Sequence, residues 1–171
     1  MPFVHVCPLS QVPATVALSG ARHLVSLIND GTPVVRPDTI PERNHLFLGI
    51  NDIVEPAEGL VAPAEEHVRT LIGFVGTWDR KRPIVIHCYA GISRSTAAAF
   101  IALCALGPER SEHDIAFRLR DASPSATPNP RLVAFADDIL GRSGRMSAAI
   151  RAIGRGEAAY EGTPFALAVE T

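Results

Sequence analysis

The segment from Pro83 to Leu106, PIVIHCYAGISRSTAAAFIALCAL, constrains the fold more than any other part of the chain. Its apolar start, before His87, is typical of a strand that is buried on both faces of a parallel sheet. A short loop of small residues follows, and an alanine-rich run begins at Arg94. A buried strand that leads through a tight loop into a helix is the repeating unit of a parallel α/β sheet.

The rest of the chain fits such a sheet, because short apolar segments alternate with helical patterns early and helical patterns dominate late. Strands are expected at residues 3–7, 23–28, 45–50 and 83–88. Helices are expected at residues 10–20, 63–80, 95–106, 111–122, 129–140 and 147–153, with Ser10 as the cap of the first. We therefore predict a three-layer α/β domain, a small and mostly parallel sheet with helices on both faces and a helical C-terminal half.

Composition excludes several classes of function. The formal net charge of -2 gives no support for general nucleic-acid binding, and no run of about 18 apolar residues predicts a membrane span. The start of the chain does not have the pattern of a signal peptide. The three cysteines are too few for a disulfide framework, which favours a reducing compartment, the cytoplasm. The histidines lack metal-ligand spacing, so we expect no metal and no cofactor.

The loop after the buried strand can hold both a nucleophile and a tetrahedral anion. Gly91 permits backbone angles that other residues resist, and a tight loop before a helix aims its N–H groups inward as an anion nest. The helix that starts near Arg94 adds its positive end, and the guanidinium can grip two oxygens of a phosphate. The same field favours the thiolate form of Cys88. This arrangement suits attack of sulfur on phosphorus.

The sequence HCYAGISRST resembles the signature loop of the cysteine-dependent protein tyrosine phosphatase superfamily, in its compact, dual-specificity-like branch. The shared pattern is His-Cys, five residues, Arg, and then Ser or Thr. The resemblance implies that Cys88 is the nucleophile, that Ser95 hydrogen-bonds its sulfur, and that His87 orients the loop. It also implies that the phosphoryl oxygens are bound by Arg94 and by the backbone of Tyr89, Ala90, Gly91, Ile92 and Ser93. No metal is required.

A phosphatase of this kind needs a proton donor for the leaving group, on a separate loop. Asp52 is the best candidate, because it follows a strand and its position resembles that of the acid loop in the compact branch. Glu55, in the same loop, is the alternative. Asn129 matches a Pro-Asn element of compact members whose side chain reaches the active site. It equally fits a simple helix cap before Pro130, and the sequence leaves both readings open.

The expected function is hydrolysis of a phosphomonoester through a phosphocysteine intermediate. The five variable loop positions carry no lysine or arginine, which favours a singly phosphorylated substrate over a highly charged inositol lipid. Phosphotyrosine in a protein is the expected substrate, with phosphoserine and phosphothreonine also open. The alternatives are a non-catalytic phosphate-binding module and a phosphatase for nucleotide, RNA or lipid phosphates.

The resemblance covers residues 1–140, which we predict to be the catalytic domain. Residues 141–171 match no part of the catalytic core and are expected to form a C-terminal extension, helical at first and then a loose tail. If the core ends near Leu140, this extension should be dispensable for the chemistry.

Overall fold

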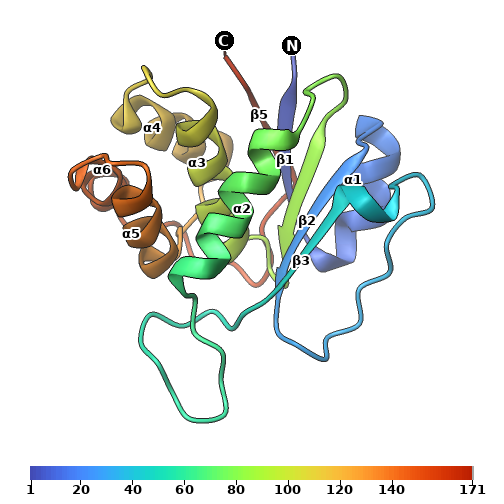
Figure 1. Ribbon diagram of the computed structural model, residues 1–171, viewed down its shortest axis with the longest axis horizontal. Coiled ribbons are helices and arrows are strands. Elements are labelled where there is room, and N and C mark those ends of the chain that lie inside the picture. Colours follow the sequence, from blue (N-terminus) through green and yellow to red (C-terminus); the bar gives the residue numbers. More distant parts are fainter. Residues whose placement is uncertain (171) are drawn as a thin grey trace.

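The strands lie side by side in the order β3-β2-β4-β1-β5 (Figure 1). This arrangement is seen in a computed structural model, which describes residues 1–170. The first four strands run parallel to one another, and β5 is antiparallel to β1. The predicted α/β fold with a mostly parallel sheet is therefore confirmed. The strands are β1 (Phe3–Pro8), β2 (His23–Ile28), β3 (His45–Gly49), β4 (Ile84–Cys88) and β5 (Phe165–Ala168).

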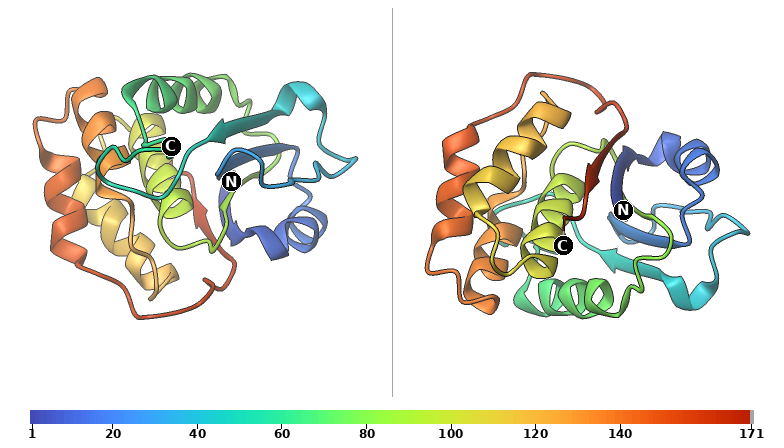
Figure 2. Two further views of the ribbon diagram at one scale, coloured as in Figure 1. Left: turned by 90° about the horizontal axis from the view of Figure 1, so that it is seen from below. Right: turned by 90° about the horizontal axis from the view of Figure 1, so that it is seen from above.

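Helices cover both faces of the sheet, but unequally (Figure 2). One face is covered by α1, and the other is covered by α2 and α3, with α4, α5 and α6 packed outside them. Helices occur wherever the sequence predicted one, with ends shifted by a few residues. They are α1 (Val12–Ser19), α2 (Glu65–Thr77), α3 (Arg94–Leu106), α4 (Glu112–Ala122), α5 (Pro130–Ile139) and α6 (Arg145–Ile153). Within residues 1–170, no helix combines the length and the apolar character that crossing a membrane requires.

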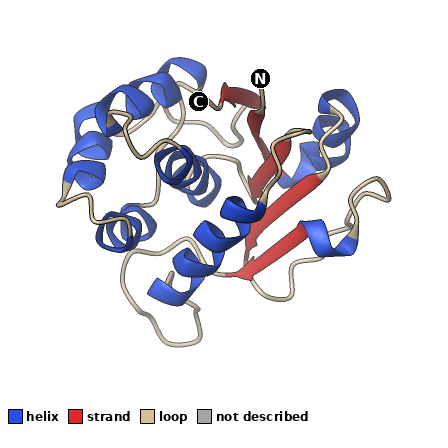
Figure 3. Cartoon of the chain, turned by 45° about the horizontal axis from the view of Figure 1, so that its top comes forward, coloured by secondary structure: helices blue, strands red, loops and turns tan. Residues whose placement is uncertain are grey.

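The central helix α3 lies between the sheet and the outer helices (Figure 3). Every residue from Arg94 to Cys104 is buried. The alanines of its first two turns suit this position, because small side chains let neighbouring elements approach the helix closely. The helix is thereby fixed on all sides, and so is the loop that leads into it.

Two expectations were wrong. The C-terminal tail is not loose, because residues 165–168 form β5 and pair with β1 at the edge of the sheet. Ser10 does not cap the first helix: a short 3-10 turn, η1 (Leu9–Gln11), precedes α1, and Gln11 holds the cap position. The Ser10 hydroxyl instead donates to the carboxylate of Glu161, at 3.1 and 3.2 Å. Both differences bring the end of the chain against its beginning. The division into domains at residue 140 stays a prediction.

Candidate active site

The carboxyl ends of the parallel strands meet at one edge of the sheet, the usual place for a ligand site in this type of fold. At this edge β4 ends at Cys88, residues 89–93 form a loop, and α3 begins at Arg94. The Cys88 side chain is 2% exposed and lies at the base of the loop. Its sulfur accepts a hydrogen bond from the Gly91 N–H at 3.3 Å and lies 3.1 Å from the Ser95 hydroxyl oxygen.

The carbonyl groups of this loop are held by elements outside it. A peptide unit is planar and trans, so a carbonyl that points outward leaves the N–H of the same unit pointing the opposite way. Several loop N–H groups are therefore directed inward, as an anion nest requires. The bonds run from Leu9 N to Tyr89 O (3.1 Å), Gly162 N to Ala90 O (2.8 Å), Thr127 N to Ile92 O (2.9 Å) and Asn129 N to Ser93 O (3.2 Å).

The conformation of the loop depends on Gly91. Its φ angle is 72°, which other residues adopt at a cost. A Cβ atom at this position would lie 2.7 Å from the backbone nitrogen of Pro8 and 2.8 Å from the carbonyl carbon of Cys7. The loop therefore packs directly on the backbone at the end of β1, and no larger residue fits at Gly91.

Arg94 is 6% exposed and is anchored by one side of its guanidinium. Its Nη1 donates to the Asn29 side-chain oxygen and to the Ile50 carbonyl, both at 2.7 Å. Its Nε is buried and has no partner within residues 1–170. A buried N–H without a partner is costly, so this atom indicates a place where an acceptor binds. An oxyanion above the loop would satisfy it.

Asp52 lies in the loop after β3, beside residues 89–93, which we call the cysteine loop. Its Oδ1 accepts hydrogen bonds from the Ser93 hydroxyl at 2.7 Å and from the Asn129 amide at 2.9 Å. In the described part of the chain, its Oδ2 has no hydrogen-bond partner. Residues 52–55 line one shallow hollow with Ser93 and Asn129. Glu55 belongs to the same hollow but has no such contacts.

Asn129 caps α5 and also contacts the loop that carries Asp52, while its role in an active site stays a prediction. Its side-chain oxygen caps α5 by accepting from the N–H groups of Arg131 and Leu132, at 3.0 and 3.1 Å. Its side-chain nitrogen donates to Asp52 and, at 3.2 Å, to the carbonyl of Ile53. The cap therefore ties the start of α5 to the loop that carries Asp52.

His87 connects the cysteine to a chain of polar groups inside the sheet. Its Nδ1 lies 3.0 Å from the Cys88 carbonyl, which can only accept, so Nδ1 carries the proton. Burial lowers the pKa of His87 to about 4, so the ring is neutral and its Nε2 accepts from Ser26 at 2.6 Å. The Ser26 hydroxyl also lies 2.8 Å from Nε2 of His45. This chain fixes the orientation of the Cys88 carbonyl.

The other two cysteines, Cys7 and Cys104, are buried. Burial raises the pKa of Cys7 to about 11 and that of Cys104 to about 12, so both remain thiols at neutral pH. All three cysteines are free. Within residues 1–170, no group of three or more His, Cys, Asp and Glu side chains is placed to hold a metal ion.

Four residues that support the loop were not predicted from the sequence. Asn29 anchors Arg94, Ser26 and His45 support His87, and Gly162 holds the Ala90 carbonyl. Two signals were present for β2, since Ser26 is a polar residue inside an apolar strand and Asn29 follows the end of that strand. Gly162 gave no signal, because its contribution is a backbone N–H.

The fold is similar to that of solved structures, whereas comparisons of the sequence find no match. No family model matches the sequence, and no curated protein matches it. Solved structures do match: DUSP15 has a TM-score of 0.64 at 18% identity, covering 91% of this chain and 94% of that one. A Cydia pomonella phosphatase, PTP-2, has a TM-score of 0.61 at 18% identity, covering 79% of this chain and 84% of that one.

A third match is the human tyrosine phosphatase-like serine/threonine/tyrosine-interacting protein. Its TM-score is 0.63 at 16% identity, with 82% of this chain and 92% of that chain covered. The protein therefore has the fold of the cysteine-dependent protein tyrosine phosphatase superfamily, in its compact, dual-specificity-like form.

Proposed function

We propose that the protein is a metal-independent cysteine phosphatase that hydrolyses phosphomonoesters, with phosphotyrosine in proteins as its main substrate and phosphoserine or phosphothreonine as further ones. One observation carries the proposal: the Cys88 sulfur has two hydrogen-bonding neighbours at the base of an inward-facing nest, and a buried Arg94 N–H beside it lacks a partner. A nucleophile and a site for a tetrahedral dianion therefore coincide.

In the first step the Cys88 thiolate attacks phosphorus. The sulfur–phosphorus bond forms as the bond from phosphorus to the leaving oxygen breaks, and Asp52 Oδ2 gives its proton to that oxygen. The loop N–H groups and Arg94 bind the three other phosphoryl oxygens while charge is redistributed over them. The products are an alcohol or phenol and a phosphocysteine at Cys88.

In the second step water attacks the phosphorus of the phosphocysteine. The Asp52 carboxylate takes a proton from this water, and the sulfur leaves as a thiolate. The Ser95 hydroxyl, 3.1 Å from the sulfur, donates to the leaving thiolate and stabilises it. Inorganic phosphate is released, and the enzyme returns to its starting state with Asp52 protonated.

The residues around the entrance of the site favour a substrate with a small, singly phosphorylated group. Tyr89 is 55% exposed at the rim, where its ring can contact the ring of a phosphotyrosine. No lysine or arginine lies among the variable loop positions, residues 89–93. We assign the protein to the cytoplasm within this proposal, because its three cysteines are free and a reducing compartment keeps them so.

A non-catalytic phosphate-binding module is the main rival, and one of the similar structures is named a phosphatase-like interacting protein. Two contacts favour catalysis. A binder has no use for a hydroxyl beside the cysteine sulfur, as Ser95 provides, or for an acid held at the rim, as Asp52 is.

The test is hydrolysis of an activated aryl phosphate in the presence of a metal chelator. We expect the wild type to turn over and Cys88→Ser to lose turnover while still binding phosphate or vanadate. Cys7→Ser is the matched control and should retain activity. A folded wild type that binds vanadate without hydrolysing any monoester would be a binding module, and activity that is confined to nucleotide, RNA or lipid phosphates would overturn the substrate assignment.

A further inference from the structure

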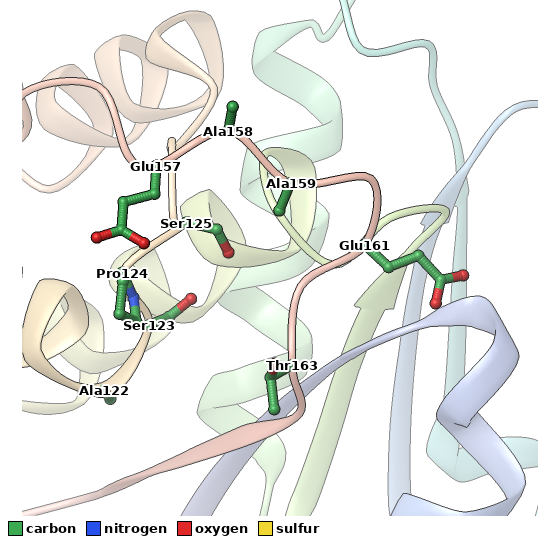
Figure 4. A pocket seen from close by; sticks show the side chains of 9 residues that line it. All are labelled: Ala122, Ser123, Pro124, Ser125, Glu157, Ala158, Ala159, Glu161 and Thr163. Carbon is green, nitrogen blue, oxygen red and sulfur yellow. The ribbon is translucent and has the colours of Figure 1, made fainter.

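The segment that connects α6 to β5, residues 154–164, runs along the outside of the domain to the edge of the sheet (Figure 2). We call it the C-terminal strap. It passes residues 123–125 and then approaches the cysteine loop (Figure 4). Two carboxylates, Glu157 and Glu161, lie on it and are exposed, whereas Gly162 is buried.

The strap contacts the cysteine loop at Gly162. Its N–H donates to the Ala90 carbonyl at 2.8 Å. A Cβ atom at Gly162 would lie 2.8 Å from the Gly91 carbonyl oxygen, closer than such contacts allow. The strap and the loop are therefore in direct backbone contact, and this contact requires glycine on the side of the strap.

The strap is fixed on both sides of this contact. Near its start, Gly156 N donates to the Thr127 hydroxyl at 3.0 Å and Glu157 N donates to the Pro124 carbonyl at 2.9 Å. Next to Gly162, Glu161 accepts from the Ser10 hydroxyl. Beyond it, β5 pairs with β1. The position of Gly162 is consequently determined by the sheet and the helices together.

The bond to Ala90 bears on the cysteine sulfur through a single peptide unit. The Ala90 carbonyl and the Gly91 N–H belong to the same planar unit and point in opposite directions. Gly162 holds the carbonyl from outside, and the N–H meets the Cys88 sulfur at 3.3 Å inside. Rotation of this unit would turn away a single donor, the Gly91 N–H, which serves the sulfur and belongs to the nest.

We propose that the C-terminal strap is a positioning element of the catalytic loop, with Gly162 as the residue that sets the Ala90–Gly91 peptide unit so that its N–H faces Cys88 and the phosphoryl group. Gly162 touches neither substrate nor sulfur, so it is a positioning residue and acts through Gly91. The catalytic relevance of this role rests on the proposed phosphatase function, but the effect on Cys88 does not.

The test compares Gly162→Ala with Gly76→Ala in the full-length protein. Gly76 makes a matched control, since a Cβ there meets nothing within 4 Å and its φ is not positive. We expect Gly162→Ala to lower kcat/KM for an aryl phosphate roughly 10- to 100-fold, because small misplacements of catalytic groups have effects of this size. Gly76→Ala should match the wild type.

The second readout is the pH profile of alkylation of Cys88 by iodoacetate. Loss of a donor to the thiolate should move this profile to higher pH in Gly162→Ala and leave it in place in Gly76→Ala. A merely structural role would lower the unfolding temperature without moving the profile. A folded Gly162→Ala with wild-type alkylation would overturn the proposal. The profile is informative even if the wild type hydrolyses no monoester, so the two proposals can fail separately.

If Gly162→Ala does not fold, Glu161→Ala and Glu157→Ala take its place. Both remove an exposed carboxylate from the strap, but of the two only Glu161 accepts a hydrogen bond from Ser10. Loss of negative charge by itself would favour the thiolate. A shift of the alkylation profile to higher pH in Glu161→Ala, relative to Glu157→Ala, therefore supports a positioning strap, and identical profiles overturn it.

Discussion

The cysteine loop and the C-terminal strap are in contact but are encoded in different ways. The cysteine loop, residues 89–93, has its chemistry in the side chains that flank it: the thiol of Cys88, the guanidinium of Arg94 and the hydroxyl of Ser95. The strap contributes backbone, a single N–H that holds one loop carbonyl. Substitutions in the loop should therefore remove chemistry and leave the fold, whereas substitutions around the strap and the C-terminal helices should act on stability or geometry first.

The largest effect on kcat among these substitutions is expected for Asp52→Ala, beside the cysteine loop. Loss of the proposed proton donor should lower kcat about 10²- to 10⁴-fold on a phosphotyrosine peptide, because a positioned general acid is worth about that much. KM should change little, since the proposal assigns phosphate binding to the cysteine loop and not to Asp52. The effect should be small for an aryl phosphate whose leaving group departs without a proton.

Glu55→Ala is the matched control for this experiment, because it removes a carboxylate from the same hollow. It should leave kcat near the wild-type value. If Glu55→Ala loses activity and Asp52→Ala does not, the acid loop is right and the residue is wrong. Asp52→Ala is also the variant to use for capturing natural substrates.

In the C-terminal helices, by contrast with the cysteine loop, a substitution should act on stability. Glu112→Ala should destabilise these helices. Glu112 is 6% exposed and accepts from Arg142, itself 5% exposed, at 2.7 Å. Removing one partner leaves a buried charge, which costs about 3–5 kcal/mol of unfolding free energy. Chemical denaturation of the variant and the wild type measures this difference in unfolding free energy.

Glu65→Ala breaks the exposed pair with Arg69 and serves as the control; it should cost less than about 1 kcal/mol. At low denaturant, kcat of the folded Glu112→Ala protein should stay within a few-fold of the wild type. A large loss of kcat without loss of stability would contradict the division of roles between the two regions.

Arg94→Lys tests whether the loop needs geometry as well as charge. Lysine keeps the positive charge but cannot replace both the anchored Nη1 and the buried Nε. We expect kcat/KM to fall about 10²- to 10³-fold, the range for one lost transition-state donor. Arg82→Lys is the control, because this exposed arginine precedes the start of β4, whereas the loop follows the end of that strand. A near-wild-type Arg94→Lys enzyme would refute the proposed clamp.

The smallest effect concerns how the free energy of unfolding depends on pH. It arises in the hydrogen-bonded chain of His87, Ser26 and His45. The buried ring of His87 has a pKa lowered from 6.5 to about 4, so between these values the unfolded chain takes up a proton and the folded protein does not. Stability should therefore be full above pH 6.5 and fall by about 3 kcal/mol toward pH 4. Burial also lowers the pKa values of His5, His23 and His45 and adds to the slope.

Denaturation of His87→Asn across this pH range isolates the contribution of His87. Asparagine keeps a donor for the Cys88 carbonyl but does not titrate. The variant should show a flatter dependence of unfolding free energy on pH than the wild type. Parallel profiles would show that His87 is not protonated on unfolding in this range.

The sequence predicted those features that depend on residues close to one another along the chain. The buried strand at β4, the helix pattern and the spacing of Cys88 and Arg94 each reflect residue types that have few alternatives in that arrangement. Asp52 and Asn129 were predicted as separate features, and the structure brings them together at 2.9 Å. Their contact depends on how two loops that are distant in the sequence pack together, and no local sequence pattern predicts this.

The C-terminal segment could not be predicted for the same physical reason. A glycine N–H that bonds to a carbonyl far away in the sequence leaves no trace in residue types beyond the glycine itself. The strand β5 is four residues long and alternates Phe and Leu with alanine, a weak pattern. Its pairing with β1 and the contact of Gly162 with Ala90 lead us to expect that truncation after Leu140 disturbs the chemistry, contrary to the expectation from sequence.

The central claim is that catalysis passes through a covalent phosphocysteine at Cys88, and trapping that intermediate tests it most directly. The wild type, mixed with an aryl phosphate and quenched in acid during turnover, should carry one phosphoryl group on the peptide that contains Cys88. Cys88→Ser should carry none, and Cys7→Ser should be labelled like the wild type. Turnover without any phosphoryl group on Cys88, or with the group on another residue, would contradict the account.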